Sequence, residues 1–221
     1  VIDATRMTVV PGFIDAHNHP GGVTELYDVD ANVRSVEALQ AALAKKAATT
    51  PAGFWVNGYM FDDTKLAGGR RLHRRDLDAV STQHPILVQH RGGHTAWYNT
   101  KAFELATVTK DTPDPTGGRF FRDPDGTPNG WVAELANDVF EHVGQREQFT
   151  AAQELERRRN GMAHMSKLYT AAGLTTVHDL SASSENIRAY EDVRAAGGLR
   201  HRAYLMVRGA AFPKLRDAGV Y

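Results

Sequence analysis

The sequence predicts an α/β fold whose strands run parallel. Short apolar segments alternate with segments of helical spacing, and the connections between the apolar segments are long enough to hold crossover helices. Such crossovers are expected to be right-handed. Only five strands are predicted, which is too few for a closed eight-stranded barrel of about 250 residues. The sheet is therefore either open or part of a barrel.

The predicted elements follow one another in a regular order. Strands are predicted at residues 9–19, 54–60, 85–90, 174–180 and 202–207. Ser35 is suited to cap the first helix, in which Leu39 and Leu43 recur at helical spacing before Pro51 and Gly53 end it. Further helical segments are predicted at residues 74–80, 101–106, 135–143 and 151–172 and around residues 187–193.

Two local motifs make parts of this prediction specific. The sequence Asp123-Pro124-Asp125-Gly126 strongly favours a turn and lies between two short apolar runs. Residues 117–134 are therefore predicted to form a β-hairpin, which departs from the alternation of strands and helices. Thr150 and Gln153 match a capping box at the start of a long helix, and Gly173 follows its end.

Composition excludes several classes of function. The 221 residues include 26 acidic and 26 basic side chains and no cysteine, so disulfides and thiolate metal sites are excluded and no nucleic-acid or membrane partner is expected. No apolar stretch approaches the roughly 20 residues of a membrane span. The start of the chain lacks both Met and a signal peptide, which predicts a cytoplasmic protein and a chain that begins inside a longer one.

The stretch "VVPGFIDAHNHPGG", residues 9–22, carries the clearest chemical signal. On a regular strand Asp15, His17 and His19 would share one face, and the strand would end at Pro20, at the carboxyl edge where α/β folds place their sites. This pattern favours metal binding over two polar histidines that bond to the backbone. Two ligands do not hold a catalytic zinc ion, which normally has three protein ligands.

Beyond these residues, the segment "PGFIDAHNH" resembles the first-strand signature of the amidohydrolase superfamily, which comprises metal-dependent hydrolases on a distorted (β/α)8 barrel. Other segments resemble the branch that contains N-substituted formamide deformylase, and the match spans nearly the whole chain. These segments are "FWVNGYMFDD" (54–63), "HPILVQHRGGHTAWYNTKAFELA" (84–106), "GGRFFRDPDGTPNGWVAE" (117–134) and "GLTTVHD" (173–179).

The resemblance implies an architecture and a set of metal ligands. Residues 11–221 would form the N-terminal part of a TIM-like barrel, with the hairpin 117–134 as an excursion, and residues 1–10 would be the end of a small β-sandwich strand. His17, His19 and Glu134 would bind one or two divalent metal ions, and Zn²⁺ is the expected ion. An acid solvated at a helix N-terminus is the alternative for Glu134.

The resemblance also implies roles for residues after the later strands. His94 is predicted to contact the substrate or an oxyanion, although Gly92 stands where relatives usually have Asp. Asp179 is predicted to be catalytic, and only one of His178 and Asp179 can face a barrel interior. The predicted pocket residues are Tyr59, Asp62, Trp97 and His178. The alternatives are a solvent-exposed turn acid for Asp62 and a core histidine bonded to backbone for His178.

These expectations define a reaction and a competing hypothesis. Metal-activated water would hydrolyse the C–N bond of a small amide-like substrate. The late histidines and aspartate of such enzymes do not occur before Tyr221, so the chain is predicted to be the first half of a longer hydrolase, inactive alone. The competing hypothesis is a non-catalytic half-barrel that binds a ligand or self-associates through an exposed sheet edge. The sequence that follows Tyr221 would discriminate between them.

Overall fold

The computed structural model describes residues 3–209 and 211–217, which fall into two compact units. Unit 1 comprises Val1–Leu26 and Phe149–Tyr221, and unit 2 comprises Tyr27–Gln148. Unit 2 is therefore inserted into the sequence of unit 1, and the chain passes between the units twice. Neither residues 1–2 nor residues 218–221 belong to the described part.

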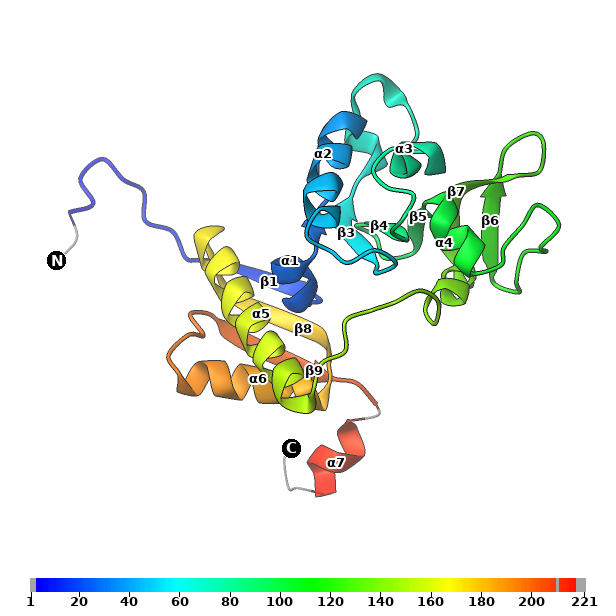
Figure 1. Ribbon diagram of the computed structural model, residues 1–221. Helices are drawn as coiled ribbons and strands as arrows, with labels where there is room; N and C mark the ends of the chain where they lie inside the picture. Colours follow the sequence, from blue (N-terminus) through cyan, green and yellow to red (C-terminus); the bar gives the residue numbers. More distant parts are fainter. Residues whose placement is uncertain (1–2, 210, 218–221) are drawn as a thin grey trace. The chain divides into compact units, whose positions relative to one another are not determined.

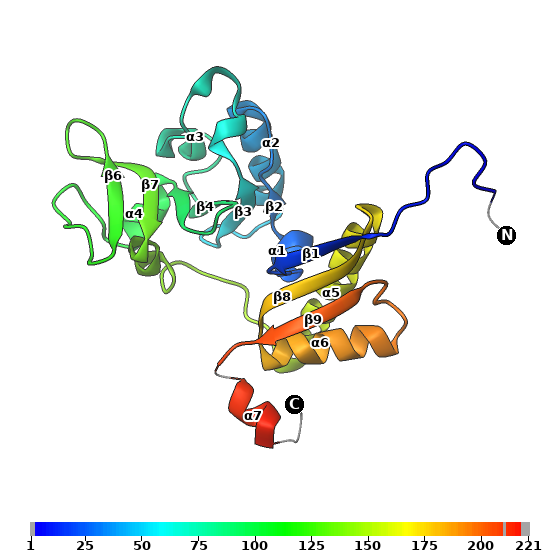
Figure 2. The same ribbon diagram turned by 180° about the vertical axis from the view of Figure 1, so that it is seen from behind.

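Unit 1 is built on a three-stranded parallel sheet in the order β1-β8-β9. Its strands are β1 (Phe13–Asn18), β8 (Leu174–Ala182) and β9 (Arg202–Val207). Helices α5 (Ala151–Ala171) and α6 (Ser184–Ala195) cover the same face of this sheet, as the two opposite views agree (Figures 1 and 2). The short helices α1 (Val23–Tyr27) and α7 (Phe212–Asp217) follow β1 and β9. The sheet and helices form two layers, as the crossover prediction requires.

Helix α5 has the N-terminal cap that the sequence predicts. The Thr150 side chain accepts a hydrogen bond from the backbone of Gln153, and the Gln153 side chain bonds back to the Thr150 N–H. Further along the helix, Gly161 lies against Gly22, where a Cβ atom on Gly161 would be 2.5 Å from the Gly22 carbonyl carbon. This close approach of two backbones requires glycine. It ties the loop after β1 to the middle of α5.

Unit 2 contains a six-stranded mixed sheet in the order β2-β3-β4-β5-β7-β6. Strands β2, β3 and β4 are parallel, and β4-β5, β5-β7 and β6-β7 are antiparallel. The strands are β2 (Val29–Asp30), β3 (Val56–Phe61), β4 (Ile86–His90), β5 (Thr95–Tyr98), β6 (Gly118–Arg122) and β7 (Pro128–Glu134). Strands β6 and β7 confirm the predicted hairpin, whose turn is closed by a hydrogen bond from Gly126 N to Asp123 O of 2.9 Å.

The helices of unit 2 are short and surround two large clusters of buried apolar residues. The α-helices are α2 (Val36–Ala47), α3 (Arg74–Asp78) and α4 (Thr100–Leu105), and the 3₁₀ helices are η1 (Asp63–Lys65), η2 (Ala67–Gly69) and η3 (Leu135–Phe140). Ser35 caps α2 as predicted. Leu39 and Leu43 of α2 are fully buried, which fits the helical spacing that the sequence showed.

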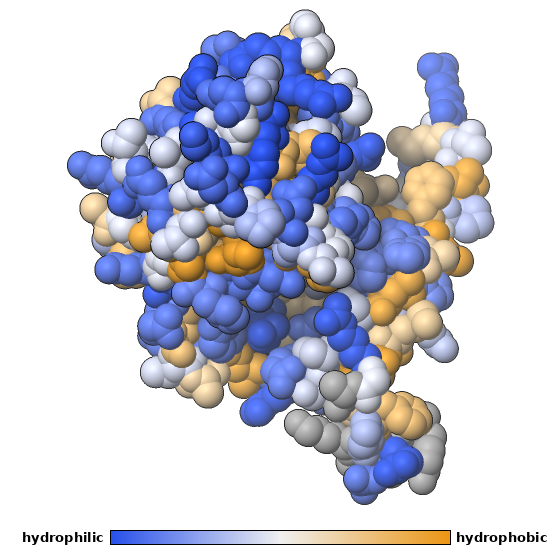
Figure 3. Space-filling model, turned by 90° about the vertical axis from the view of Figure 1, so that its right-hand side faces the viewer, coloured by the Kyte–Doolittle hydropathy of each residue, from blue (hydrophilic) through white to orange (hydrophobic). Residues whose placement is uncertain are grey.

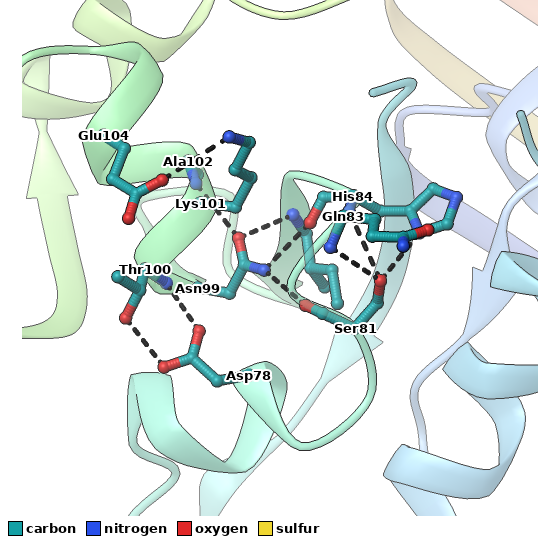
Figure 4. A network of polar contacts seen from close by, with 10 residues as sticks. Asp78, Ser81, Gln83, His84, Asn99, Thr100, Lys101, Ala102 and Glu104 are labelled. Atoms are coloured by element: carbon teal, nitrogen blue, oxygen red, sulfur yellow. Dashed lines mark hydrogen bonds and ion pairs between the residues drawn. The ribbon is translucent and has the colours of Figure 1, made fainter. Parts of the chain in front are cut away.

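Asn99 connects β4 to α4 through four hydrogen bonds (Figure 4). Its side-chain oxygen accepts from the backbone N–H groups of Ile86 and Ala102, at 2.9 and 3.1 Å. Its amide group donates to the carbonyl oxygens of Ser81 and His84, at 3.1 and 2.9 Å. The Asn99 side chain is completely buried and each of its polar atoms is hydrogen-bonded. Asn99 therefore stabilises the connection between β4 and α4 in unit 2.

The structure confirms the α/β class and changes the arrangement of the strands. The predicted strands 54–60 and 85–90 belong to the sheet of unit 2, whereas the other three form the sheet of unit 1. Apolar runs identify strands but do not say which sheet a strand joins. The predicted helical segment 135–143 is a shorter 3₁₀ helix at residues 135–140. Residues 3–10 contain no strand, and their assignment to a β-sandwich stays a prediction.

On the face seen in Figure 3, hydrophobic residues are interspersed with hydrophilic ones. Within residues 3–209 and 211–217, no helix is both long and apolar enough to cross a membrane.

Candidate metal centre and ligand cavity

The imidazole rings of His17 and His19 converge at the end of β1. Their Nε2 atoms are 3.2 Å apart, and the ring planes are nearly perpendicular. Two nitrogens on a tetrahedral ion with metal–nitrogen bonds of 2.0–2.1 Å lie roughly 3.3 Å apart. The distance between the two nitrogens is therefore compatible with binding of one divalent cation. A hydrogen bond between two neutral rings is the alternative account of the same distance.

The second nitrogen of His19 is bonded in a way that suits metal binding. His19 Nδ1 is 3.2 Å from Ser181 Oγ, which lies near the carboxyl end of β8. If Nδ1–H donates to this hydroxyl, the lone pair of Nε2 is free for a cation, which is how metal-binding histidines are usually held. Because β1 and β8 are parallel neighbours, their carboxyl ends lie at one edge of the sheet, as the sequence predicts. Among the described residues, no third His, Asp or Glu joins the pair as a close donor.

The expectation that Asp15, His17 and His19 share one strand face is wrong for Asp15. The register between β1 and β8 shifts between Asp15 and Asn18, so strict alternation fails there. The Asp15 carboxylate accepts from the His17 backbone N–H and the Asn18 amide. Asn18 in turn accepts a hydrogen bond from the Tyr169 hydroxyl of α5, which places Asp15 and Asn18 toward the helices. The predicted strand is also shorter than expected, and His17 and His19 are exposed rather than buried.

His178 and Asp179 of β8 point to opposite faces of the sheet. His178 Nδ1 donates to the Asp15 carbonyl oxygen at 2.8 Å, and the ring lies beside Tyr204 of β9. Asp179 is 1% exposed; its Oδ1 accepts from the Ser181 N–H, and its Oδ2 has no hydrogen-bond partner among the described residues. Burial raises the pKa of Asp179 above its usual value. The predicted catalytic role of Asp179 stays a prediction.

His94 and Glu134 meet within unit 2. The Nδ1 atom of His94 is 3.1 Å from Glu134 Oε2, and both residues line a cavity of about 330 Å³. Trp55, Tyr98 and Phe140 belong to its apolar lining. Glu134 thus has a partner already, and whether it binds a metal together with His17 and His19 stays a prediction.

The remaining predicted pocket residues occupy different environments. Trp97 is 3% exposed and belongs to the core of unit 2, where it stacks against Trp131 at 5.9 Å. Tyr59 is partly buried in β3. Asp62 is 3% exposed and forms an ion pair with Arg91 at 2.9 Å, so the alternative of a solvent-exposed turn acid is wrong.

Asp62, Asp63 and His90 form a cluster that sequence reasoning missed. Each residue offers a donor atom within 4.8 Å of the others, because β3 and β4 are parallel and end side by side. Arg91 and Lys65 already neutralise Asp62. His90 Nδ1 accepts from the Gly92 N–H, so the neutral ring carries its proton on Nε2, the atom that faces Asp63. The ring would have to lose its bond to Gly92 before it could bind a cation through Nε2.

The chain is similar in sequence to several known proteins. The chain is 29% identical over 223 residues to N-substituted formamide deformylase from Arthrobacter pascens, a match that covers 99% of this chain and 41% of that protein. It is 28% identical over 209 residues to the exoenzymes regulatory protein AepA from Pectobacterium carotovorum subsp. carotovorum, covering 90% of this chain and 44% of the relative. The chain therefore spans about two fifths of the length of these relatives.

Solved structures show the same fold. An uncharacterized metal-dependent hydrolase from Pyrococcus furiosus superposes with a TM-score of 0.54 at 21% identity, over 94% of this chain and 40% of that one. One from Pyrococcus horikoshii gives a TM-score of 0.55 at 21% identity, over 95% and 39%. At this level of identity the likeness shows a shared fold. Residues 1–216 match the amidohydrolase family, and the chain belongs to that family.

Proposed function

We propose that this chain is part of an enzyme that hydrolyses a C–N bond of a small amide- or formamide-like substrate with metal-activated water. Membership of the amidohydrolase family supports hydrolysis. The relative named N-substituted formamide deformylase supports a formamide-like substrate. The observation that carries the proposal is the distance of 3.2 Å between His17 Nε2 and His19 Nε2 at the carboxyl edge of the unit 1 sheet.

In this proposal His17 and His19 hold a divalent ion, for which Zn²⁺ is the best match because the available donors are nitrogen and oxygen. When bound, such an ion lowers the pKa of a water molecule toward about 7 and polarises a carbonyl group. Ser181 orients His19 through its contact with Nδ1. At least one further ligand must come from outside this pair, because zinc sites in hydrolases have three protein ligands.

The other residues act on the substrate in this proposal. Asp179 transfers a proton, for which its raised pKa is suited. Within unit 2, Tyr59 and Asp62 are proposed as pocket residues and His94 as a substrate contact, and within unit 1 His178 is proposed as a pocket residue, whereas Trp97 lies in the core of unit 2. The resemblance also implies Glu134 as a ligand, although its carboxylate is bonded to His94.

Metal content of the purified chain tests the proposal. Because only two ligands are present, we expect weak binding: after equilibrium dialysis against Zn²⁺ the wild type should contain more metal than the His17→Ala, His19→Ala double variant, as measured by elemental analysis. The matched control is His142→Ala, His164→Ala, which removes two histidines with no assigned role and should retain the metal. Equal metal in the wild type and the His17→Ala, His19→Ala variant would refute the site.

A specific observation also favours self-association. Strands β1 and β9 are the two edges of the unit 1 sheet, and the side chains of Phe13, Ile14, Tyr204 and Met206 on these strands are exposed. Unpaired edges with exposed apolar residues promote pairing between chains. Light scattering during gel filtration would show a concentration-dependent dimer, and a monomer at all concentrations would exclude it.

A further inference from the structure

His94 and Glu134 make two contacts, one between their side chains and one between their backbones. The backbone contact extends the pairing of two strands in the sheet of unit 2. Besides the contact between His94 Nδ1 and Glu134 Oε2, the Glu134 backbone N–H donates to the His94 carbonyl oxygen at 2.8 Å. The neighbouring residues Thr95 and Ala133 are opposite each other in the antiparallel pair β5-β7. The side-chain pair therefore continues a strand ladder and is more than a chance contact between two mobile surface groups.

Glu134 has a backbone conformation that side-chain-bearing residues rarely adopt. Its φ is 54° and its ψ is −136°, in a region that is favourable for glycine. Neighbouring hydrogen bonds hold this conformation: Asn137 donates to the Glu134 carbonyl oxygen, and Leu135 N donates to the Gly117 carbonyl oxygen. Strain that the surroundings maintain at a single side-chain-bearing residue is common at binding and catalytic sites.

The contact with Glu134 determines where the neutral His94 ring carries its proton. An ionised carboxylate can only accept hydrogen bonds, so His94 Nδ1–H is the donor. The lone pair of the neutral ring is then on Nε2. His94 belongs to the lining of the 330 Å³ cavity and its side chain is 75% exposed, so Nε2 is accessible to a ligand.

The rest of the cavity also favours a ligand that donates hydrogen bonds. Asp138 and Glu141 line it in addition to Glu134, so acceptors outnumber donors among its charged groups. Arg146 is the basic side chain of the lining, and its two terminal nitrogens already donate to the carbonyl oxygens of Val143 and Phe140. An anionic ligand would face three carboxylates and a guanidinium that is already bonded.

We propose that Glu134 is a positioning residue that fixes His94 as the Nδ1–H tautomer, so that His94 Nε2 accepts a hydrogen bond from a small N–H-bearing ligand in the unit 2 cavity. The role of the pair does not depend on metal binding; only the identification of the ligand as an amide substrate rests on the proposed function. The proposal differs from the metal-ligand role that the resemblance implies, because the carboxylate acts on an imidazole.

Long-range ¹H–¹⁵N correlation spectra of the full chain, labelled at histidine, test the positioning role. We expect wild-type His94, assigned with His94→Asn, to be mainly the Nδ1–H tautomer. In Glu134→Ala the ratio of Nδ1–H to Nε2–H should fall by about threefold or more, a size that suits an exposed pair. Glu134→Gln should lie between the two because its amide oxygen can still accept. Glu141→Ala, which removes a different cavity carboxylate, should leave the ratio unchanged.

Two results would overturn the proposal. One is the same tautomer ratio in wild type, Glu134→Gln and Glu134→Ala, since Glu134 would then have no effect on the ring. The other is a His94 ratio that changes when Zn²⁺ is added to the wild type but not to Glu134→Ala, since Glu134 would then be a metal ligand. Loss of Zn²⁺ binding at His17 and His19 with an unchanged His94 spectrum would contradict the proposed function alone.

Titration with acetamide tests the ligand class in the same spectra. We expect a progressive shift of the His94 Nε2 resonance in wild type, with a smaller shift at equal acetamide concentration in Glu134→Ala. N,N-dimethylacetamide has the same carbonyl group but no N–H, and it should produce no such shift. Equal shifts with both compounds would overturn the assignment of an N–H-donating ligand.

Discussion

Unit 2 has a large core and a buried polar network in which every bond is made, whereas unit 1 has two small apolar clusters. Among the described residues, both units bury polar atoms without a hydrogen-bond partner, such as Asp179 Oδ2 and His201 Nε2 in unit 1 and Arg74 Nε and Trp131 Nε1 in unit 2. The proposed metal pair lies in unit 1. The comparison indicates that the unit with the clearest chemical signal gains less stability from its own packing, as is common where a site must keep its reactive groups accessible.

The two units can be followed separately during unfolding. All three tryptophans, Trp55, Trp97 and Trp131, belong to unit 2, so tryptophan fluorescence reports on unit 2 alone. Circular dichroism reports on both units, and α5, the longest helix, belongs to unit 1. If the units unfold independently, urea titrations should show separate transitions, and unit 1 should unfold first.

The largest effect is expected for Asn99→Ala in unit 2. This change leaves four backbone groups without their partner, three of them in buried bonds, and it should lower the free energy of unfolding by roughly 3–5 kcal/mol. The fluorescence transition should move to lower urea. Asn99→Asp retains the acceptor but loses both donors, so it should also destabilise. An unchanged fluorescence transition in Asn99→Ala would refute the structural role of this side chain.

Gly161→Ala should have the next largest effect, and it should act on unit 1. The new Cβ would be 2.5 Å from the Gly22 carbonyl carbon and 2.7 Å from Val23 N, and backbone atoms cannot move aside easily. We expect a loss of about 1–3 kcal/mol, seen by circular dichroism and not by fluorescence. Zn²⁺ binding should weaken as well, since the displaced loop follows His19. Gly209→Ala is the control, because its added Cβ would meet nothing within 4 Å.

Thr150→Ala should destabilise unit 1 by about 1 kcal/mol through loss of the α5 cap. The circular dichroism transition should shift, and the fluorescence transition should not. Thr150→Ser retains the hydroxyl group and should behave like the wild type. If the serine variant lost as much stability as the alanine variant, the cap would not be the cause.

Asp179→Asn should have the smallest effect, and it should stabilise unit 1 at pH 7 where the other changes destabilise. Burial raises the pKa of Asp179, so the folded state binds more protons than the unfolded state between the two pKa values, and stability falls as pH rises through that range. The neutral amide of the variant avoids this loss and should raise the melting temperature of unit 1 at pH 7. The advantage should vanish below the unfolded-state pKa of about 3.9. A lower melting temperature at pH 7 would contradict the desolvation of this carboxyl group.

The sequence predicted local structure well where the signal was local. The caps at Ser35 and Thr150 and the turn at residues 123–126 are confirmed, because each depends on a few adjacent side chains. The division into two sheets could not be predicted, because it depends on pairing between strands far apart in the chain. The register shift between β1 and β8 after Asp15 could not be predicted, because the spacing of apolar residues does not indicate it.

The candidate site was predicted in part. The approach of the His17 and His19 rings follows from their spacing and is seen in the structure, while their role as ligands stays a prediction. Trp97 was assigned to a pocket and is in a core, because a large aromatic ring on a strand suits either environment. His90 was missed because its acidic neighbours come from a different strand. The bond between His94 and Glu134 required the pairing of β5 with β7.

The insertion of unit 2 has a consequence for the order in which the protein forms on the ribosome. The ribosome synthesises the chain from its N-terminus. The hydrogen bond between the Asp15 carbonyl oxygen and His178 can therefore form only after 163 further residues have been added. Unit 2 is complete by Gln148 and can fold first, while β1 remains without its neighbour until β8 emerges. Nascent chains of this protein therefore expose the segment that carries His17 and His19 longer than any part of unit 2, and we expect them to depend most on chaperones during that interval.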